Sequence, residues 1–364
     1  MAQPKATLAN WRTAPHNRWA FHHVRELVPS ADIPNDVAKV RPLERSAAPL
    51  PDLEAFIRET DTDGLLVLHR GRIVLERYGN GMTGDTPHIL MSVSKSMLGL
   101  LFHLLELDAE RPVSEIVPDL GRTAYRRAKL RHLLDMRAGI AFDEDYLAAS
   151  GPIIQYRKAT GWNPLAPGES PSDLHSFYEV LTETDGEHGG RFHYVSPNTD
   201  LLGWVIEEAT GRRYAELMSE RVWKPAGAER SAYITVDRLG APRCAGGMCA
   251  TLRDLARVGQ WMIETRAGFL EDLERHADAQ AWAAGDLAQY YPGLPMRYRS
   301  QWYLLDGAAP LAFGMGIHGQ NLFVDRANHI VIAKLSSQAL PLDAARMAYT
   351  MRVVSDIRKH LTRQ

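Results

Sequence analysis

The hydrophobic positions of the chain predict strands near both ends and helices between them. Residues 64–79 contain two β-rich runs separated by a polar break at Arg70-Gly71, a pattern typical of a β-hairpin. Further strands are predicted near Gln301 and within residues 320–337, where residues 325–329 form the turn between two alternating runs. Because hairpins join neighbouring strands that run in opposite directions, these segments predict an antiparallel sheet.

Helical periodicity dominates the remaining segments, whereas the first 51 residues show little periodicity and are expected to form an extended arm around the body. The predicted helices are residues 51–60, 113–121, 130–139, 172–183, a hairpin over 198–223 that breaks at Gly211, 252–264 and 344–361. The fold class expected is therefore α/β (α+β), an antiparallel sheet flanked by helices with an all-helical inserted domain. We place the first part of the α/β domain at 1–121, the helical domain at 122–227 and the second α/β part at 228–364.

The composition favours small molecules or other proteins as partners. The 364 residues are 45% hydrophobic and 24% charged, and the net charge of −2 gives no electrostatic basis for binding nucleic acid or an anionic membrane. The N-terminus has no signal-peptide core and no stretch is long enough to span a membrane, so a cytoplasmic location is expected. Cys244 and Cys249 match no metal or redox spacing, and whether they pair stays open, as does the oligomeric state.

The strongest candidate chemistry lies in residues 89–105, where Ser92 is followed three positions later by Lys95. In a helix that begins near Ser92, positions i and i+3 share a face, so the hydroxyl and the amine become neighbours. The following segment is apolar on every side, which predicts a buried helix and a lysine whose pKa is lowered by desolvation. A neutral lysine can remove the proton of a serine nucleophile. The alternative is a helix-capping serine beside a lysine that extends to solvent.

Two later segments could complete such a site. Tyr194 lies in a loop before a helix whose cap is expected at Asn198 or Thr199, and its phenol could pass a proton between nucleophile and leaving group. The alternative is a core tyrosine with a satisfied hydroxyl. The glycines at 314, 316 and 319 precede a strand, where an edge-strand N–H, that of Ile317, could form an oxyanion hole with the N–H of Ser92. The alternative is a glycine bulge that only bends the sheet.

The order of these segments resembles class C β-lactamases and penicillin-binding proteins, and most closely the 6-aminohexanoate-dimer hydrolase group of serine hydrolases. The motifs that carry the resemblance are NWRTAPHNRWAF, MSVSKS, DEDY, YVSPNTDLLGWVIE, TLRDLARVG, GIHGQNLFVD and VIAKLSS, which span nearly the whole chain. The resemblance implies that Ser92 is the acylated nucleophile, Lys95 its base and Tyr194 the proton relay. It also implies that the N–H groups of Ser92 and Ile317 hold the oxyanion, and that Tyr146 bonds the scissile amide nitrogen.

The resemblance further implies a substrate pocket, and this chain departs from the family pattern there. The predicted substrate-binding residues are Glu144, Arg157, Trp162, Ala245 and His318. Arg157 stands where amide-hydrolysing members carry an aspartate for the substrate ammonium, and Ala245 stands where they carry a polar residue. A cation at Arg157 would repel an amino-terminated oligoamide and favour a neutral or acidic substrate. His318 suggests a serine-histidine triad at first sight, but we expect it to order the glycine loop instead.

These observations predict a serine hydrolase that cleaves carboxylic esters of short acyl groups, with linear amides as a second substrate class, through an acyl-enzyme on Ser92. The expected partner is a small-molecule ester or amide, with no nucleic acid and no membrane, and no motif for a metal or cofactor is present. The alternatives are a 6-aminohexanoate-oligomer amidase, a β-lactamase or D,D-peptidase, and a non-catalytic ligand-binding module on the same fold. The lysine-threonine-glycine triplet of true β-lactamases is replaced by Gly314-Met315-Gly316, which argues against penicillin turnover.

Overall fold

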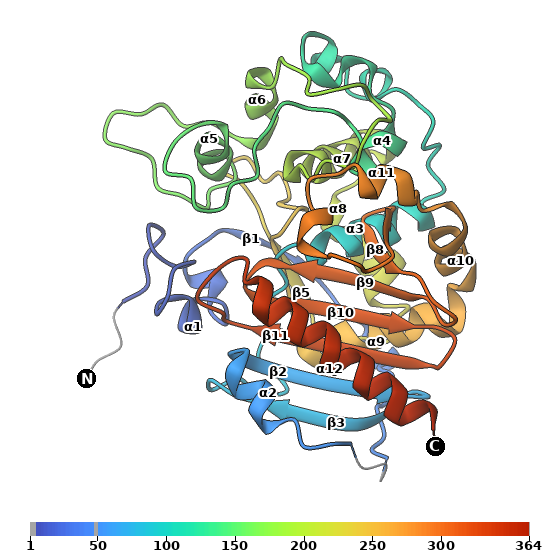
Figure 1. Ribbon diagram of the computed structural model, residues 1–364. Helices are drawn as coiled ribbons and strands as arrows, with labels where there is room; N and C mark the ends of the chain where they lie inside the picture. Colours follow the sequence, from blue (N-terminus) through green and yellow to red (C-terminus); the bar gives the residue numbers. More distant parts are fainter. Residues whose placement is uncertain (1–4, 47–49, 364) are drawn as a thin grey trace.

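The computed structural model describes residues 5–46 and 50–363, and its centre is a seven-stranded antiparallel sheet (Figure 1). The strands, in spatial order, are β3 (Arg72–Tyr78), β2 (Thr62–His69), β11 (Ile330–Ser336), β10 (Gln320–Asp325), β9 (Leu311–Gly316), β8 (Trp302–Leu305) and β7 (Met296–Arg299). Strand β2 from the N-terminal part pairs with β11 from the C-terminal part, in the register Leu66↔Ala333. The two ends of the chain therefore build one sheet, as the hydrophobic pattern predicts.

The sheet is covered by helices on both faces, which explains why its central strands are almost continuously apolar. Leu66 and Leu68 belong to the core shared with α9 (Leu252–Thr265), whereas Leu65 and Val67 belong to the core shared with α12 (Ala344–Thr362). Figure 1 shows α12 crossing the front of the sheet and α9 lying behind it. Successive side chains of a strand point to opposite faces, so a strand buried on both faces loses the alternation of polar and apolar residues.

A second sheet was not predicted from the sequence. It has four strands in the order β1 (Ser30–Ile33), β5 (Ala232–Thr235), β6 (Met248–Ala250) and β4 (His88–Ile89). Because β1 belongs to the N-terminal segment, the prediction of a merely extended arm is wrong in part. The arm wraps the body, but it also pairs with β5 and carries a short helix, α1 (Asn17–Ala20). Strands of two to four residues are too short to show a readable alternation.

The described residues between 122 and 227 contribute helices and no strand to either sheet. These helices are α4 (Leu130–Leu134), α5 (Pro152–Ala159), α6 (Leu174–Phe177), α7 (Ser196–Thr210), α8 (Tyr214–Met218) and a π-helical turn, Ser219–Trp223. Gly211 ends α7 in the left-handed conformation, with φ of 64°, as the predicted break requires. The boundaries of the helical domain at 122 and 227 stay predictions, because these helices pack into the same core as the sheet.

The remaining helices close the structure around the sheet. They are α2 (Glu54–Glu59), α3 (Val93–Leu104), α10 (Ala267–His276) and α11 (Ala279–Ala283). Helix α3 is buried from Val93 to Phe102, which confirms the prediction of a buried helix after Ser92. Among the described residues, no helix is both long and apolar enough to span a membrane. Cys244 and Cys249 are buried, unpaired thiols.

Candidate active site

Ser92 stands at the N-terminus of α3, on a tight turn that brings it beside the end of β9. The preceding residue, Met91, has a φ of 45°, a conformation that non-glycine residues rarely adopt outside constrained sites. A Cβ atom added to Gly316 would lie 2.9 Å from the backbone nitrogen of Ser92 and 2.8 Å from the carbonyl oxygen of Leu90. Only glycine allows the two backbone segments to approach this closely. Gly316 therefore allows the end of β9 to lie against the turn that carries Ser92.

Lys95 lies one turn further along α3, and its amine faces Ser92 as the spacing predicts. Its Nζ lies 3.1 Å from Ser92 Oγ, 3.0 Å from Ser196 Oγ and 2.7 Å from the carbonyl oxygen of Ala245. The residue is 1% exposed, and burial lowers the pKa of Lys95 to about 7 although the Glu144 carboxylate acts in the opposite direction. The alternative of a lysine that extends to solvent is wrong.

The hydrogen bonds around Lys95 fix the direction of its lone pair. A neutral amine has two N–H donors and one lone pair, and the Ala245 carbonyl can only accept. The second N–H is directed to Ser196 Oγ, whose own hydroxyl donates to a carboxylate oxygen of Glu144. The other oxygen of Glu144 accepts from the backbone N–H of Ser196 at 2.8 Å. The lone pair of Lys95 is left for the hydroxyl proton of Ser92.

Ser196 was not predicted from the sequence as a site residue. It stands two positions after Tyr194, at the start of α7, and joins the Glu144 carboxylate to the Lys95 amine. A serine at the start of a helix is usually a cap, so its type and position alone do not indicate a catalytic role. Only its closeness in sequence to Tyr194 could have pointed to the active site.

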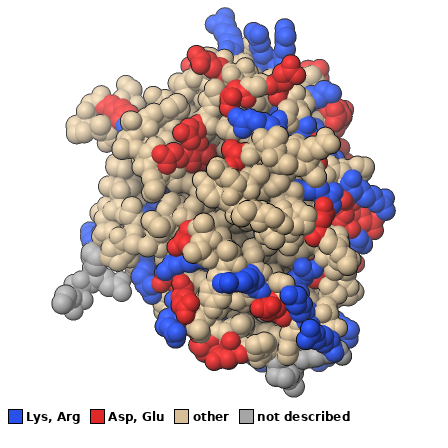
Figure 2. All heavy atoms as spheres, in the orientation of Figure 1, with Lys and Arg blue, Asp and Glu red and all other residues tan. Residues whose placement is uncertain are grey.

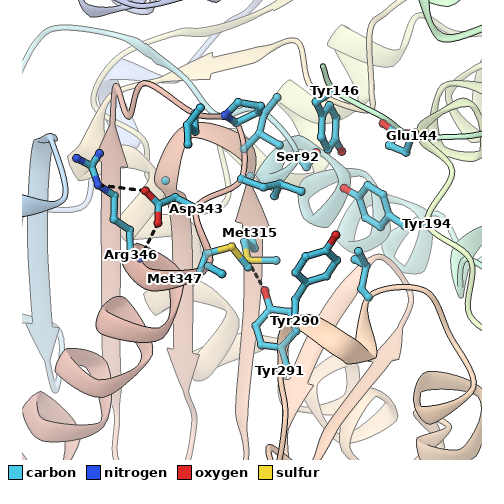
Figure 3. A pocket seen from close by; sticks show the side chains of 18 of the residues that line it. Ser92, Glu144, Tyr146, Tyr194, Tyr290, Tyr291, Met315, Asp343, Arg346 and Met347 are labelled. Atoms are coloured by element: carbon cyan, nitrogen blue, oxygen red, sulfur yellow. Dashed lines mark hydrogen bonds and ion pairs between the residues drawn. The ribbon is translucent and has the colours of Figure 1, made fainter. Parts of the chain in front are cut away.

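Two tyrosines bring neutral phenols to the nucleophile. Burial and the Glu144 carboxylate raise the pKa of Tyr194, while its hydrogen bonds with Ser92 and Tyr303 act in the opposite direction. The ring of Tyr194 also lies 5.0 Å from Lys95 Nζ. Burial and Glu144 likewise raise the pKa of Tyr146. Both residues line the cleft beside Ser92, so each can donate a hydrogen bond to a reacting group there (Figure 3).

Ile317 follows β9 directly, at the start of a 3-10 turn (Ile317–Gly319), and lines the cleft together with Ser92. The expectation that it belongs to an edge strand is wrong, because β9 lies between β8 and β10. Pairing between β8 and β9 runs from Tyr303↔Phe313 to Leu305↔Leu311 and does not reach Ile317. The end of an interior strand can thus offer a backbone N–H to a ligand.

The main cleft has a volume of about 620 Å³ and runs from Ser92 to α12. Figure 3 shows Tyr146, Glu144 and Tyr194 on one side of Ser92, and Met315 and Tyr291 along the cleft toward α12. Apolar side chains form much of its lining, namely Leu147, Leu287, Tyr290, Tyr291, Met315, Phe323, Leu340, Leu342, Met347 and Met351. These side chains favour an apolar organic group, and the cleft is also lined by charged residues, namely Asp143, Glu144, Asp145, Asp286, Asp343 and Arg346.

A much smaller pocket of about 30 Å³ opens on the other side of Ser92 and is lined by Arg12, Arg157, Trp162 and Arg243. Trp162 is 4% exposed and donates from Nε1 to Thr235 Oγ1. A guanidinium nitrogen of Arg157 donates to the carbonyl oxygens of Tyr146, at 3.0 Å, and Asp145, at 3.4 Å. Arg157 therefore lies at the pocket as predicted, but it also holds the loop that carries Tyr146.

Arg12 and Arg243 were not predicted from the sequence to reach this pocket. Arg243 is 7% exposed and pairs with the Asp200 carboxylate and the Tyr156 hydroxyl. Arg12 donates to Asn163, and burial together with the charges of Arg157 and Arg243 lowers the pKa of Arg12 to about 9. No sequence spacing links these arginines, which come from distant segments.

The structure brings most predicted site residues together and leaves His318 outside. Ser92, Glu144, Tyr146, Tyr194 and Ile317 line the main cleft, while Ala245 lies beside Lys95 and the small pocket. His318 is 3% exposed, its Nδ1 lies 2.7 Å from the carbonyl oxygen of Gln338, and its ring packs against Phe21. It does not line either cavity, so its prediction as a substrate-binding residue has no geometric support, whereas its contacts do order the glycine loop.

A serine at the start of a buried helix, a desolvated lysine at i+3 and a neighbouring tyrosine define an active-site serine hydrolase of the β-lactamase-like fold. The profile of the family described as Beta-lactamase matches residues 53–355, and the chain belongs to this family. It is a serine hydrolase of the family.

The chain is similar to a 6-aminohexanoate-dimer hydrolase from Paenarthrobacter ureafaciens, with 37% identity over 92% of this chain and 89% of the relative. A solved structure described as a putative 6-aminohexanoate-dimer hydrolase from Bacillus anthracis superposes with a TM-score of 0.88 at 25% identity, covering 100% of this chain and 98% of that one. The hydrolase EstCE1, with promiscuous acyltransferase activity, shares the fold at a TM-score of 0.61 and 18% identity, over 85% of this chain and 98% of its own. The resemblance to the 6-aminohexanoate-dimer hydrolase group is thereby confirmed.

Proposed function

We propose that the protein hydrolyses carboxylic esters of short acyl groups, and linear amides as a second class, through an acyl-enzyme on Ser92. The observation that carries the proposal is the buried amine of Lys95, 3.1 Å from Ser92 Oγ, whose two N–H donors are committed to Ala245 and Ser196. Such an amine can take only the proton of Ser92, which makes the serine oxygen a nucleophile.

In the proposed reaction, Ser92 Oγ attacks the substrate carbonyl as its proton passes to Lys95. The negative charge that develops on the carbonyl oxygen is held by the N–H groups of Ser92 and Ile317. Tyr194, a neutral phenol beside Ser92, gives its proton to the leaving group and regains one from Lys95. A water molecule then attacks the acyl-enzyme along the reverse relay, and Ser92 is released.

The shapes of the two cavities support short acyl groups. The small pocket, of about 30 Å³, is far smaller than the main cleft and therefore favours a short acyl group over a long one. The apolar cleft of about 620 Å³ on the other side has room for a larger organic group. Amide hydrolysis is supported by Tyr146, which lines the cleft beside Ser92, and by the name of the 37% identical relative.

The charges at the small pocket support a neutral or anionic substrate. Three guanidinium groups, those of Arg12, Arg157 and Arg243, line it together with one carboxylate, that of Glu144. Asp200 offsets the charge of Arg243, whereas Arg12 and Arg157 donate hydrogen bonds to uncharged acceptors, the side-chain amide of Asn163 and the backbone carbonyls of Asp145 and Tyr146. A substrate ammonium placed here would be repelled by the remaining positive charge.

The direct test of the proposal is turnover of p-nitrophenyl acetate, butyrate and octanoate, together with a linear amide and a chromogenic cephalosporin. The proposal predicts that the acetate and butyrate esters are hydrolysed with the highest kcat/KM, and that the cephalosporin is not turned over. A folded protein that hydrolyses neither esters nor the linear amide would instead be a ligand-binding module, and efficient cephalosporin turnover would favour the β-lactamase alternative.

Replacing Arg157 with aspartate is expected to change the preference for substrate charge. With two esters that differ only in a terminal carboxylate or ammonium, the wild type should favour the anionic ester. The variant should lower the ratio of the two kcat/KM values by about tenfold or more, since 1.4 kcal/mol of charge interaction corresponds to a factor of ten. Lys158→Asp makes the same charge change at the next position of α5, where Lys158 pairs with Glu169 away from the pocket, and should leave the ratio unchanged. Equal ratios in wild type and Arg157→Asp would contradict the assignment.

A further inference from the structure

A second cluster of chemically active side chains lies outside the active site, where three distant segments meet. His22 follows α1 in the N-terminal segment, Asp63 belongs to β2, and His88 belongs to β4, four positions before Ser92. Their exposed fractions are 8%, 1% and 0%. One ligand atom from each residue lies within 4.8 Å of the other two. Buried ionisable groups are costly unless each is paired or coordinates a cation.

The contacts of His88 place one of its ring nitrogens against the carboxylate of Asp63. Its Nδ1 lies 2.7 Å from the carbonyl oxygen of Ile89, which can only accept, so Nδ1 carries a proton. In neutral His88 the other nitrogen, Nε2, then presents a lone pair, and it lies 3.2 Å from Asp63 Oδ2. Two acceptors at this distance repel unless a second proton or a metal ion lies between them.

His22 distinguishes a metal ion from a proton. Its Nε2 is 3.4 Å from the same oxygen of Asp63, but it has no partner in hydrogen-bonding geometry among the described residues. A proton shared by His88 and Asp63 would leave this buried nitrogen with only the long, poorly aligned contact to Asp63, which is unfavourable for a buried polar atom. A metal ion at the centre would satisfy all three ligand atoms together.

The distances and the donor types fit zinc. Tetrahedral zinc binds imidazole nitrogen at about 2.0–2.1 Å and carboxylate oxygen at about 2.0–2.2 Å, which places the ligand atoms roughly 3.3 Å from one another. The observed separations of 3.2 and 3.4 Å agree with this value. Two imidazoles and one carboxylate are ligands that zinc commonly takes, whereas calcium and magnesium prefer sites made only of oxygen atoms. We propose that His22, Asp63 and His88 form a zinc-binding site.

The surroundings of the three residues match those of metal ligands. His88 donates its Nδ1–H to the backbone carbonyl of Ile89, and the second oxygen of Asp63 accepts from Ser337 Oγ at 3.1 Å. Such outer hydrogen bonds orient the imidazole and carboxylate toward a metal. The bound ion would fasten the N-terminal segment to both sheets, close to the turn that carries Ser92, so its role is structural. This site could not be predicted from the sequence, because its three ligands come from separate segments without a metal-binding spacing.

The test is the zinc content and thermal stability of the full-length protein after chelation and dialysis. On incubation with zinc chloride and removal of free metal, about one zinc per chain should remain, and Tm should rise by about 2–5 °C. Magnesium chloride should not raise Tm. His22→Gln should lose both the bound zinc and the shift in Tm, whereas His103→Gln, a histidine of α3 outside the cluster, should keep both.

Two results would overturn the zinc site. One is retention of less than about a tenth of a zinc per chain with no change in Tm. The cluster would then hold a proton shared by His88 and Asp63 and no metal ion. The other is equal zinc retention in wild type and His22→Gln, which would place the metal elsewhere. If His22→Gln does not fold, the wild-type protein alone tests the proposal. A chelator should lower its Tm, and added zinc should restore it. None of these outcomes bears on the ester hydrolysis proposed above.

Discussion

Replacing Ser92 with alanine is expected to abolish hydrolysis of p-nitrophenyl butyrate. The variant keeps the oxyanion N–H groups and the cleft but lacks the oxygen that accepts the acyl group, so kcat/KM should fall by roughly 10⁴–10⁶-fold. Steady-state ester hydrolysis measures the loss, and circular dichroism checks that the fold is retained.

A serine on the same helix provides the matched control. Ser96 lies one turn after Ser92, and its hydroxyl donates to the carbonyl oxygen of Gln301 rather than pointing at the cleft. Ser96→Ala should keep kcat/KM within about tenfold of the wild type. If Ser92→Ala retained activity and Ser96→Ala lost it, the nucleophile would be wrongly assigned.

Replacing Lys95 with methionine should lower kcat/KM by about 10²–10⁴-fold, the usual contribution of a general base. Methionine fills a similar volume in the buried site but cannot take the proton of Ser92. Lys95→Arg separates the two roles that a lysine could have, because a guanidinium is a much weaker base catalyst near neutral pH but keeps a positive charge. If Lys95 acts as a base, both variants lose activity; if only its positive charge mattered, Lys95→Arg would stay active.

The low pKa of Lys95 also sets the direction of the pH dependence. Burial lowers this pKa to about 7, so the amine is protonated below that pH and neutral above it. Only the neutral amine accepts a proton, and kcat/KM should therefore rise between about pH 5 and pH 9, with its midpoint near 7. A profile that falls across this range would contradict the proposed role of Lys95.

Long periodic segments were predicted correctly because their burial repeats along the chain. The hairpin of β2 and β3, the buried helix α3 and the hairpin of α7 and α8 all lie where the hydrophobic pattern places them. The four-stranded sheet was missed because β4 and β6 have only two and three residues. Their pairing depends on contacts between distant segments, and local pattern carries no information about such contacts.

The same distinction holds for the active site. The spacing of Ser92 and Lys95 within one helix is a local property, so their contact follows from sequence alone. Arg12 and Arg243 reach the small pocket from segments more than two hundred positions apart, and only the folded chain brings them together. Family resemblance supplied Tyr146, and the glycine-marked strand already pointed to Ile317. His318 was predicted to bind substrate, but its ring is turned toward Phe21 and Gln338.

The measurement that tests the central claim most directly is the rate at which a fluorophosphonate labels the protein between pH 5 and pH 9, followed by intact mass. The account predicts a single adduct on the wild type, none on Ser92→Ala, and a labelling rate that rises with pH through a midpoint near 7. An adduct that persists in Ser92→Ala would contradict the nucleophile, and a labelling rate independent of pH would contradict Lys95 as its base.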